Sequence, residues 1–440
     1  MLTRLQAPPY DVLTPHLPKI GAADPATAQA VSEILADVRA RGDRAVQEHA
    51  RRLDGVDLAP EEWELSGARC REALGRVPRP VQAALELAVA RVRAYHERQV
   101  EAGFTVRTAG AKLLMRVVPL DSIGIYVPGG KAAYPSTVIM NAVPAAVAGV
   151  SDVVMVTPPG GVSDVVLTAA QLAGVHRVFR VGGPQAIAAL AYGTATIPRV
   201  DKIVGPGNRF VTEAKRQVVG TVGIDMLAGP TEVLVIADRT AAVRHVAADL
   251  IAQAEHDEDA CAWCVTTSRA LADALDPELQ RQLARAPRRA IAERALGAHG
   301  VLVLVPTLDA AVEVANRRAP EHVELLVEQP WRLVQEIRHA GAIFVGSHTP
   351  EPVGDYLAGP SHVLPTAGTA RYVSPLGVYD FVKRISVIAY SRERLQQDAA
   401  HIIALAVAEG LFGHAEAVRV RESAVRRRPS PGPATEQADS

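Results

Sequence analysis

The 440-residue chain is poor in cysteine and in long apolar segments. Its three cysteines, Cys70, Cys261 and Cys264, are too few for a disulfide framework and odd in number, which fits a protein of the reducing cytoplasm. No apolar run reaches the length that a transmembrane helix requires. Pro8 and Pro9 interrupt an N-terminus that has no sustained apolar core, so we expect no secretory signal.

A surplus of either charge is also missing. The chain has 47 basic and 48 acidic residues and a formal net charge of -1. This balance provides no electrostatic footprint for nucleic acid or for an anionic membrane surface, so we expect neither partner. A small neutral or zwitterionic molecule is the more natural ligand. Hydrophobic residues make up 48% of the chain, which is typical of a globular protein with roughly two or three domains.

What is present is a regular succession of helical and strand patterns. Between Pro25 and Gln99, apolar residues recur at spacings of three and four, which predicts a layer of amphipathic helices. From Ser122 onward, short apolar runs alternate with helical patterns, which predicts two largely parallel sheets covered by helices. The predicted strands are SIGIYV, SDVVMVTPP, HRVFRVGG, VDKIVGPGN, TEVLVIAD, CAWCVTT, GVLVLVPT, HVELLVE and GAIFVG. Open parallel sheets bind ligands at the carboxyl ends of their strands, so we expect sites in the turns that follow them.

Three of those turns are rich in glycine: VPGGKAAYPST at 127–137, VGGPQ at 181–185 and VGPGN at 204–208. Glycine lets the backbone approach a phosphate closely, but ordinary tight turns need it as well. None of the three completes the GxGxxG spacing, so the standard dinucleotide fingerprint is absent.

The stretch LIAQAEHDEDACAW, at 250–263, ends an amphipathic helix that begins near residue 241. Gln253 continues the apolar stripe of this helix, and His256 follows on a neighbouring face. The two groups either cap the helix end or converge on a metal or ligand. Cys261 and Cys264 form a CxxC inside a predicted strand. Because strand residues three apart point to opposite faces, we expect core positions and no shared metal.

Further motifs carry groups suited to acid-base or metal chemistry. Glu321 and His322 adjoin at the start of a predicted strand, where they are either an acid-base pair or a solvated pair on a loop. The run PVGDYLAGPSHVLPT has little regular pattern, and it offers Asp355 and His362 as candidate ligands.

Near the C-terminus, EGLFGHAEAV offers Glu409 and His414, with a helical surface face as the ordinary alternative. Gln253, His256, Asp355 and His414 would together form a nitrogen and oxygen ligand set suited to zinc. Their spacings are too long for sequence alone to assemble them.

Several long motifs in fixed order resemble the histidinol dehydrogenase family, zinc- and NAD-dependent enzymes that end histidine biosynthesis. The motifs are YVPGGKAAYPSTVIMNAVPA, VGGPQAIAALAYGT, DKIVGPGN, GIDMLAGPTEVLVIAD, QAEHD, APEHVEL and VGDYLAGPSHVLPTAGTAR. The resemblance covers residues 25–420.

Position by position, the resemblance implies one zinc ion per subunit, with Gln253, His256, Asp355 and His414 as ligands. In the family the last ligand comes from the partner subunit, which implies an obligate homodimer with shared active sites. The positions that match the family's substrate contacts are Thr231, Gln253, His256, Glu321, His322, Asp355, Glu409 and His414. The positions that match its NAD contacts are Tyr126, Gln185 and Asn208.

The implied reaction oxidises L-histidinol to L-histidine through an aldehyde, in two steps that each pass a hydride to NAD. Zinc would orient the alcohol carbon, His322 would act as the base, and Glu321 would activate the water that hydrates the aldehyde. Two departures from the family are small: Thr231 stands where serine is common, and the residues around His414 differ. Neither departure removes a group that the chemistry needs.

Two other functions fit part of the pattern. A related zinc and NAD alcohol dehydrogenase, acting on another small amino alcohol or a sulfonated diol, would keep the same metal and cofactor positions. Glu409 argues against a sulfonated substrate, because a carboxylate suits a cationic amine and repels a sulfonate. A non-catalytic metal or ligand binder would not need an acid-base pair, yet Glu321 and His322 are both present.

The expected architecture is an α/β fold with two incomplete Rossmann-like parallel-sheet domains, a helical N-terminal layer and a C-terminal helical tail used in dimerisation. The expected boundaries are an N-terminal arm at 1–24, a first domain with the zinc and catalytic residues at 25–125 and 233–372, an NAD-binding second domain at 126–232, the dimerisation tail at 373–425, and a polar, proline-rich, disordered end at 426–440.

Overall fold

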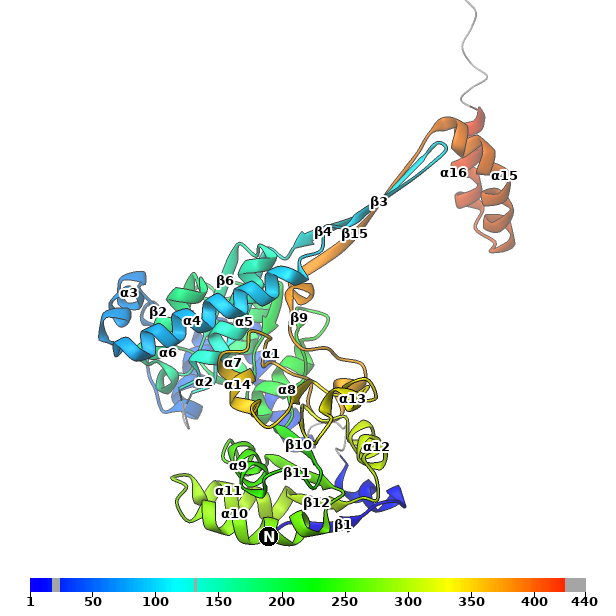
Figure 1. Cartoon of the computed structure of the whole chain (residues 1–440). Helices are drawn as coiled ribbons and strands as arrows, with labels where there is room; N and C mark the ends of the chain where they lie inside the picture. The colour runs from blue at the N-terminus through cyan, green and yellow to red at the C-terminus, as the bar shows by residue number, and fades with distance from the viewer. Residues whose placement is uncertain (18–23, 130–132, 424–440) are drawn as a thin grey trace, which may run out of the picture. The chain divides into compact units, whose positions relative to one another are not determined.

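The computed structural model describes residues 1–17, 24–129 and 133–423. Contacts divide the chain into two units, which we describe one at a time: Met1–Val100 with Pro119–Val382, and Glu101–Val118 with Lys383–Ser440. The first unit contains two six-stranded sheets with helices packed on them (Figure 1), which confirms the α/β fold class. Within the described ranges, no helix is both long and apolar enough to cross a membrane.

Sheet A is entirely parallel and has the strand order β1-β12-β11-β10-β13-β14. Its strands are β1 (Thr3–Gln6), β10 (Glu232–Ala237), β11 (Cys261–Thr266), β12 (Val301–Leu304), β13 (His322–Leu326) and β14 (Ala342–Val345). Its helices are α9 (Val243–Ala254), α10 (Arg269–Leu283), α11 (Arg289–His299), α12 (Leu308–Arg318) and α13 (Pro330–Val334). Alternate residues of β10 enter two cores, with α9 to α11 on one face and α12 with α13 on the other. Because both faces are covered, the strand reads as an unbroken apolar run.

Sheet B has the order β2-β7-β6-β5-β8-β9, and only β2 is antiparallel to its neighbour. Its strands are β2 (Glu64–Leu65), β5 (Ser122–Tyr126), β6 (Asp152–Val156), β7 (Arg177–Phe179), β8 (Lys202–Val204) and β9 (Gly223–Ile224). Its helices are α1 (Pro25–Arg41), α2 (Asp43–Asp54), α3 (Gly67–Arg76), α4 (Arg79–His96), α5 (Pro135–Ala148), α6 (Asp164–Ala173), α7 (Gly183–Tyr192) and α8 (Arg209–Val218).

The helical layer expected near the N-terminus is present, but its packing differs from the expected domain assignment. Helices α1 and α2 share a core with α7 and α8 on one face of sheet B, while α3 and α4 share a core with α5 and α6 on the other. The helices of residues 25–96 therefore pack on sheet B, and residues 101–118 belong to the second unit, whereas we expected 25–125 to join residues 233–372. An apolar stripe shows that a helix is covered, but it does not show which sheet covers it.

All nine predicted strands are confirmed, from β5 to β8 and from β10 to β14. The short strands β2 and β9 escaped prediction, and so did β1, which lies inside the expected N-terminal arm and pairs with β12. Two or four residues are too few to show a periodicity.

The second unit has a three-stranded sheet of order β15-β4-β3, formed by β3 (Phe104–Thr108), β4 (Ala111–Pro119) and β15 (Val382–Tyr390). Two helices follow, α15 (Arg392–Ala408) and α16 (Phe412–Ser423), as the two C-terminal helical patterns predict. The two helices pack on each other. The hairpin of β3 and β4 was not predicted. The segment expected to be disordered, 426–440, and part of the first glycine-rich turn, at 130–132, lie outside the described residues.

Candidate active site

The predicted catalytic residues gather at the amino ends of two neighbouring strands of sheet A. Thr231 precedes β10, and Glu321 precedes β13, whose first residue, His322, lies beside Val233 in the parallel register. Glu321 and His322 thus lie at the start of a strand, as their motif predicts, although the general rule for open parallel sheets favours the carboxyl ends. Parallel pairing brings the starts of adjacent strands together as surely as their ends.

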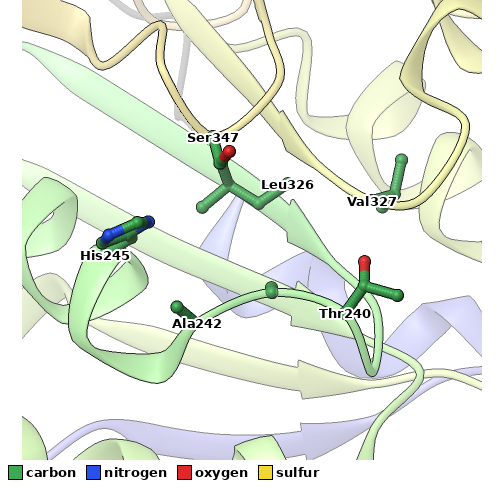
Figure 2. Close-up of a pocket in the computed structure, with 7 residues that line it drawn as sticks. Thr240, Ala242, His245, Leu326, Val327 and Ser347 are labelled. Atoms are coloured by element: carbon green, nitrogen blue, oxygen red, sulfur yellow. The ribbon is translucent and has the colours of Figure 1, made fainter.

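A small pocket lies at the carboxyl ends of the same strands. Figure 2 shows it beside α9, and its lining residues are Thr240, Ala241, Ala242, His245, Leu326, Val327 and Ser347. None of the predicted site residues lines this pocket. The two ends of β10 and β13 therefore have different surroundings, and the acid-base groups belong to the amino ends.

A chain of hydrogen bonds joins three predicted residues at this edge. The Thr231 hydroxyl donates to Glu321 Oε2 at 2.6 Å, and the Gln253 amide Nε2 donates to Thr231 Oγ1 at 2.9 Å. The backbone N–H of Glu232 also donates to Glu321 Oε2, at 2.9 Å. Since a carboxylate only accepts, the hydroxyl must face Glu321 and the amide N–H₂ must face the hydroxyl.

This direction leaves the Gln253 carbonyl oxygen, Oε1, free to bind something else. Gln253 is fully buried in the last turn of α9, and Oε1 has no hydrogen-bond partner in the part of the chain that the structure covers. A buried acceptor without a partner is unfavourable unless a ligand or water meets it. An amide oxygen without a hydrogen-bond partner can serve as a metal ligand, so Gln253 Oε1 fits the role that the resemblance implies.

His256 provides a second such atom. Its Nδ1 lies 3.2 Å from the carbonyl oxygen of Gln253, which can only accept, so Nδ1 carries the proton and Nε2 keeps its lone pair. One ring nitrogen of His256 therefore satisfies a carbonyl at the end of α9, as the capping alternative expects, and the other nitrogen is of a type that can bind a metal.

Two carboxylates complete the group. Asp355 lies on α14 (Glu351–Tyr356), a short helix in the run that we expected to be irregular, and Glu351 lies one turn before it. Ligand atoms of His256, Glu351 and Asp355 lie within 4.8 Å of one another. Zinc bonds of about 2.1 Å place tetrahedral ligands roughly 3.4 Å apart, so small side-chain movements would suffice to bind an ion.

Glu351 was missed by the sequence analysis, although its spacing of four residues from Asp355 was a usable signal. It is buried, and its backbone N–H donates to Glu324 Oε1 at 2.8 Å. Glu324 is itself buried on β13 and pairs with Asp249 of α9, so burial and this neighbour raise the pKa of the Glu324 carboxyl well above its usual range. A layer of buried acids therefore lies behind the predicted ligands.

His322 is buried among these acids. Its Nδ1 lies 2.9 Å from the carbonyl oxygen of Glu232, 3.6 Å from Glu321 Oε2 and 3.9 Å from Glu351 Oε1. Burial lowers the pKa of His322, but the carboxylates of Glu351, Glu321 and Asp355 outweigh it and raise that pKa to about 9. Because the carbonyl holds the Nδ1 proton, Nε2 is the atom that gains or loses a proton.

The predicted cofactor residues lie at the carboxyl edge of sheet B, as expected. Tyr126 ends β5, and its buried hydroxyl accepts the backbone N–H of Gly183 at 3.1 Å. Gln185 is fully buried in the first turn of α7. Asn208 follows β8 and caps α8, with Oδ1 accepting the N–H groups of Phe210 and Val211 at 3.0 and 3.1 Å. Capping accounts for the side-chain carbonyl of Asn208, and the amide N–H₂ of Asn208 takes no part in that cap.

The other candidates are placed as follows. Glu409 ends α15 and His414 lies on α16, both exposed and both in the second unit. Burial lowers the pKa of the His362 imidazole, and the nearby charge of Asp355 opposes part of that shift. Cys264 is a core residue, as predicted, while Cys261 is half-buried at the start of β11.

Comparison with known proteins supports one family. The family model described as histidinol dehydrogenase matches residues 19–422. Histidinol dehydrogenase of Aquifex aeolicus is 52% identical over 395 residues, 90% of this chain and 92% of that protein, and that of a Synechococcus strain is 52% identical over 401 residues, with the same shares. The crystal structure of histidinol dehydrogenase from Elizabethkingia anophelis superposes with a TM-score of 0.90 and 33% identity, covering 97% of this chain and 99% of that one. The chain therefore belongs to the histidinol dehydrogenase family.

Proposed function

We propose that this chain oxidises L-histidinol to L-histidine through the aldehyde, using one zinc ion and two molecules of NAD for each substrate. The observation that carries the proposal is the hydrogen-bond chain from Gln253 through Thr231 to Glu321, which ends beside His322. The chain of hydrogen bonds would link Gln253, as a zinc ligand, to Glu321 and His322, as the acid-base pair. Zinc would orient the alcohol carbon, and NAD would accept the hydrides.

Gln253, His256 and Asp355 would hold the zinc ion, together with His414 of the partner subunit. The unpartnered Oε1 of Gln253 and the position of His256 beside Asp355 support this assignment. Glu351 lies in the same group and adds negative charge beside the ion. The carboxylates of Asp355 and Glu351 would balance the charge of a divalent cation, and the cation would in turn offset the charge of these carboxylates.

His322 would act as the base for the alcohol. Nδ1 is held by the carbonyl of Glu232, so Nε2 would take the hydroxyl proton as the carbon loses its hydride. The surrounding carboxylates raise the pKa of His322 to about 9, which opposes this role at neutral pH. A cation among the same carboxylates would offset their charge and favour the neutral imidazole that a base requires.

Glu321 would activate the water that adds to the aldehyde. Its Oε2 already accepts from the Thr231 hydroxyl and from the N–H of Glu232, so the side chain is held in one orientation. Oε1 would then accept a proton from a water molecule as the water oxygen bonds to the carbonyl carbon and the π bond of the aldehyde opens. The former carbonyl oxygen would take the proton that His322 received in the first oxidation. The hydrate formed in this way again has a hydroxyl and a hydrogen on one carbon, as the second oxidation requires.

A homodimer would bring the second unit into the site of its partner. Glu409 and His414 are exposed, and so are several large apolar side chains of the same unit, among them Ile388, Leu405 and Phe412. Exposed apolar groups of this size commonly mark an interface. Glu409 of the partner subunit would pair with the cationic amine of histidinol. The free cysteines of the described chain suit an enzyme of the cytoplasm.

The proposal is tested with purified, zinc-loaded protein, NAD and L-histidinol. We expect about two NADH for each histidinol consumed and L-histidine as the product, because both oxidations occur before release. No NADH from histidinol, or one NADH with free aldehyde, would refute the assignment. A sulfonated diol in a parallel reaction tests the related alcohol dehydrogenase, and turnover of that substrate alone would favour it.

A further inference from the structure

Four residues from three parts of the chain are joined at the carboxyl edge of sheet B. The backbone N–H of Gly183 donates to the Tyr126 hydroxyl at 3.1 Å. Two residues later, the Gln185 amide Nε2 donates at 3.1 Å to Oδ2 of Asp54, the last residue of α2. Asp54 was not among the sequence-predicted site residues, and it reaches this edge only because α2 packs on α7.

Asp54 determines which way the Gln185 amide faces. A carboxylate offers only acceptors, so the N–H₂ group must point to Asp54 and Oε1 must point away from it. Gln185 is fully buried, and its Oε1 has no hydrogen-bond partner among residues 1–17, 24–129 and 133–423. The arrangement therefore presents a buried acceptor that lacks a donor.

The position of Asp54 is unfavourable for the helix that carries it. An acidic side chain in the last turn opposes the partial negative charge at a helix C-terminus. Burial also raises the pKa of the Asp54 carboxyl, with the bond from Gln185 opposing that rise. The helix itself therefore does not account for a carboxylate at this position, whereas the hydrogen bond that Asp54 accepts from Gln185 does.

Gly183 is required next to this acceptor, because any side chain there would collide with it. Its φ is +65°, which favours glycine, and a Cβ at this position would lie 2.5 Å from Gln185 Oε1. Tyr126 is buried, and burial raises the pKa of its hydroxyl to about 12, so the group keeps its proton at neutral pH. Gly183 therefore adjoins both the unpartnered acceptor, Gln185 Oε1, and a hydroxyl donor, Tyr126.

We propose that Asp54 is a positioning residue that presents Gln185 Oε1 to a ribose hydroxyl of NAD and so selects NAD over NADP. The inference rests on the proposed NAD site. A hydroxyl donates to Oε1 and satisfies it, whereas a 2′-phosphate has only acceptors there and would also meet the Asp54 carboxylate. Asp54 touches Gln185, and through it acts on the cofactor.

The test compares Asp54→Ala, Asp54→Asn and the matched control Asp57→Asn. Asp57 is an exposed acid three residues further on, paired with Arg51 at 2.7 Å. NADH and NADPH affinities are measured by fluorescence titration, together with kcat, the KM values for NAD and histidinol, and histidinol binding by calorimetry.

For Asp54→Ala we expect NADH affinity to fall about tenfold, the size of one positioned hydrogen bond, and KM for NAD to rise equally. NADPH affinity should change little or rise, so the preference for NADH over NADPH shrinks by about tenfold. Asp54→Asn should lie between Ala and wild type, because its amide can still accept from Gln185. Asp57→Asn should match wild type, and kcat and histidinol binding should stay within about twofold in all three.

Unchanged cofactor affinities in both Asp54 variants would overturn the inference while leaving the proposed function standing. A parallel loss of histidinol binding and of thermal stability would also overturn it, because Asp54 would then support the fold alone. If wild-type protein bound neither NADH nor NADPH, the proposed function would fail first and the role of Asp54 with it.

Discussion

Replacing Thr231 by valine breaks the hydrogen-bond chain of the site while keeping the shape of the side chain. The Gln253 Nε2 donor loses its acceptor at 2.9 Å, and Glu321 Oε2 loses the hydroxyl donor at 2.6 Å. Gln253 is fully buried, so its unsatisfied N–H costs about 1–3 kcal/mol, and a lost hydrogen bond to a carboxylate costs about as much. The N–H of Glu232 still serves Glu321, so we expect a total of about 2–4 kcal/mol.

The same substitution should weaken zinc binding. Without the Thr231 hydroxyl, nothing holds the Gln253 amide with Oε1 towards the metal, and loss of such a supporting hydrogen bond typically lowers metal affinity about 10–100-fold. The assays are urea unfolding of the metal-free protein and zinc competition with a chromophoric chelator. Thr231→Ser keeps the hydroxyl and is the matched control, with less than about 1 kcal/mol lost for the methyl group.

A valine variant that unfolds at the same urea concentration as the serine variant and binds zinc equally well would refute this reasoning. It would mean that Gln253 holds its orientation without Thr231, and that the chain of bonds does not organise the metal site.

Three further outcomes are expected. His322→Gln should lower kcat for histidinol by about 10²–10⁴ while calorimetric histidinol binding stays within a few-fold, and a near-normal kcat would exclude His322 as the base. Chains with Gln253→Ala and chains with His414→Ala should each be inactive alone and should recover up to about a quarter of wild-type activity when mixed. The reason is that half of the dimers would then carry one intact site. If mixed dimers are shown to form and are inactive, His414 lies outside the shared site. Burial raises the pKa of the Cys264 thiol to about 12, so thiol reagents at pH 8 should label it only after unfolding, and fast labelling of the native protein would contradict its core position.

Sequence patterns predicted the elements whose side chains show a clear periodicity or an unbroken apolar run. Strands β10 and β13 are buried on both faces, and α9 buries one stripe that ends in Gln253. Each of these signals is local, since it depends on neighbours within one element. Strands β3 and β15 were missed because they are largely exposed, so their residues do not alternate between a core and solvent.

The site residues divide in the same way. Those inside long family motifs, such as Gln253 and His322, could be named from the sequence and lie where chemistry is possible. Asp54 could not, because its contact with Gln185 joins residues that are distant in the chain, and Glu351 had only its spacing from Asp355 as a signal. Residue type alone does not show which buried acid faces which ligand.

The sequence by itself determined the α/β class, the nine main strands, the amphipathic helices and the family motifs, because all of these lie in short-range order along the chain. Only the tertiary structure decided that α1 to α4 pack on sheet B, that the start of β10 lies beside the start of β13, and which way the amides of Gln253 and Gln185 face. Those outcomes depend on packing and hydrogen bonds between distant segments, and a local pattern does not specify its partner.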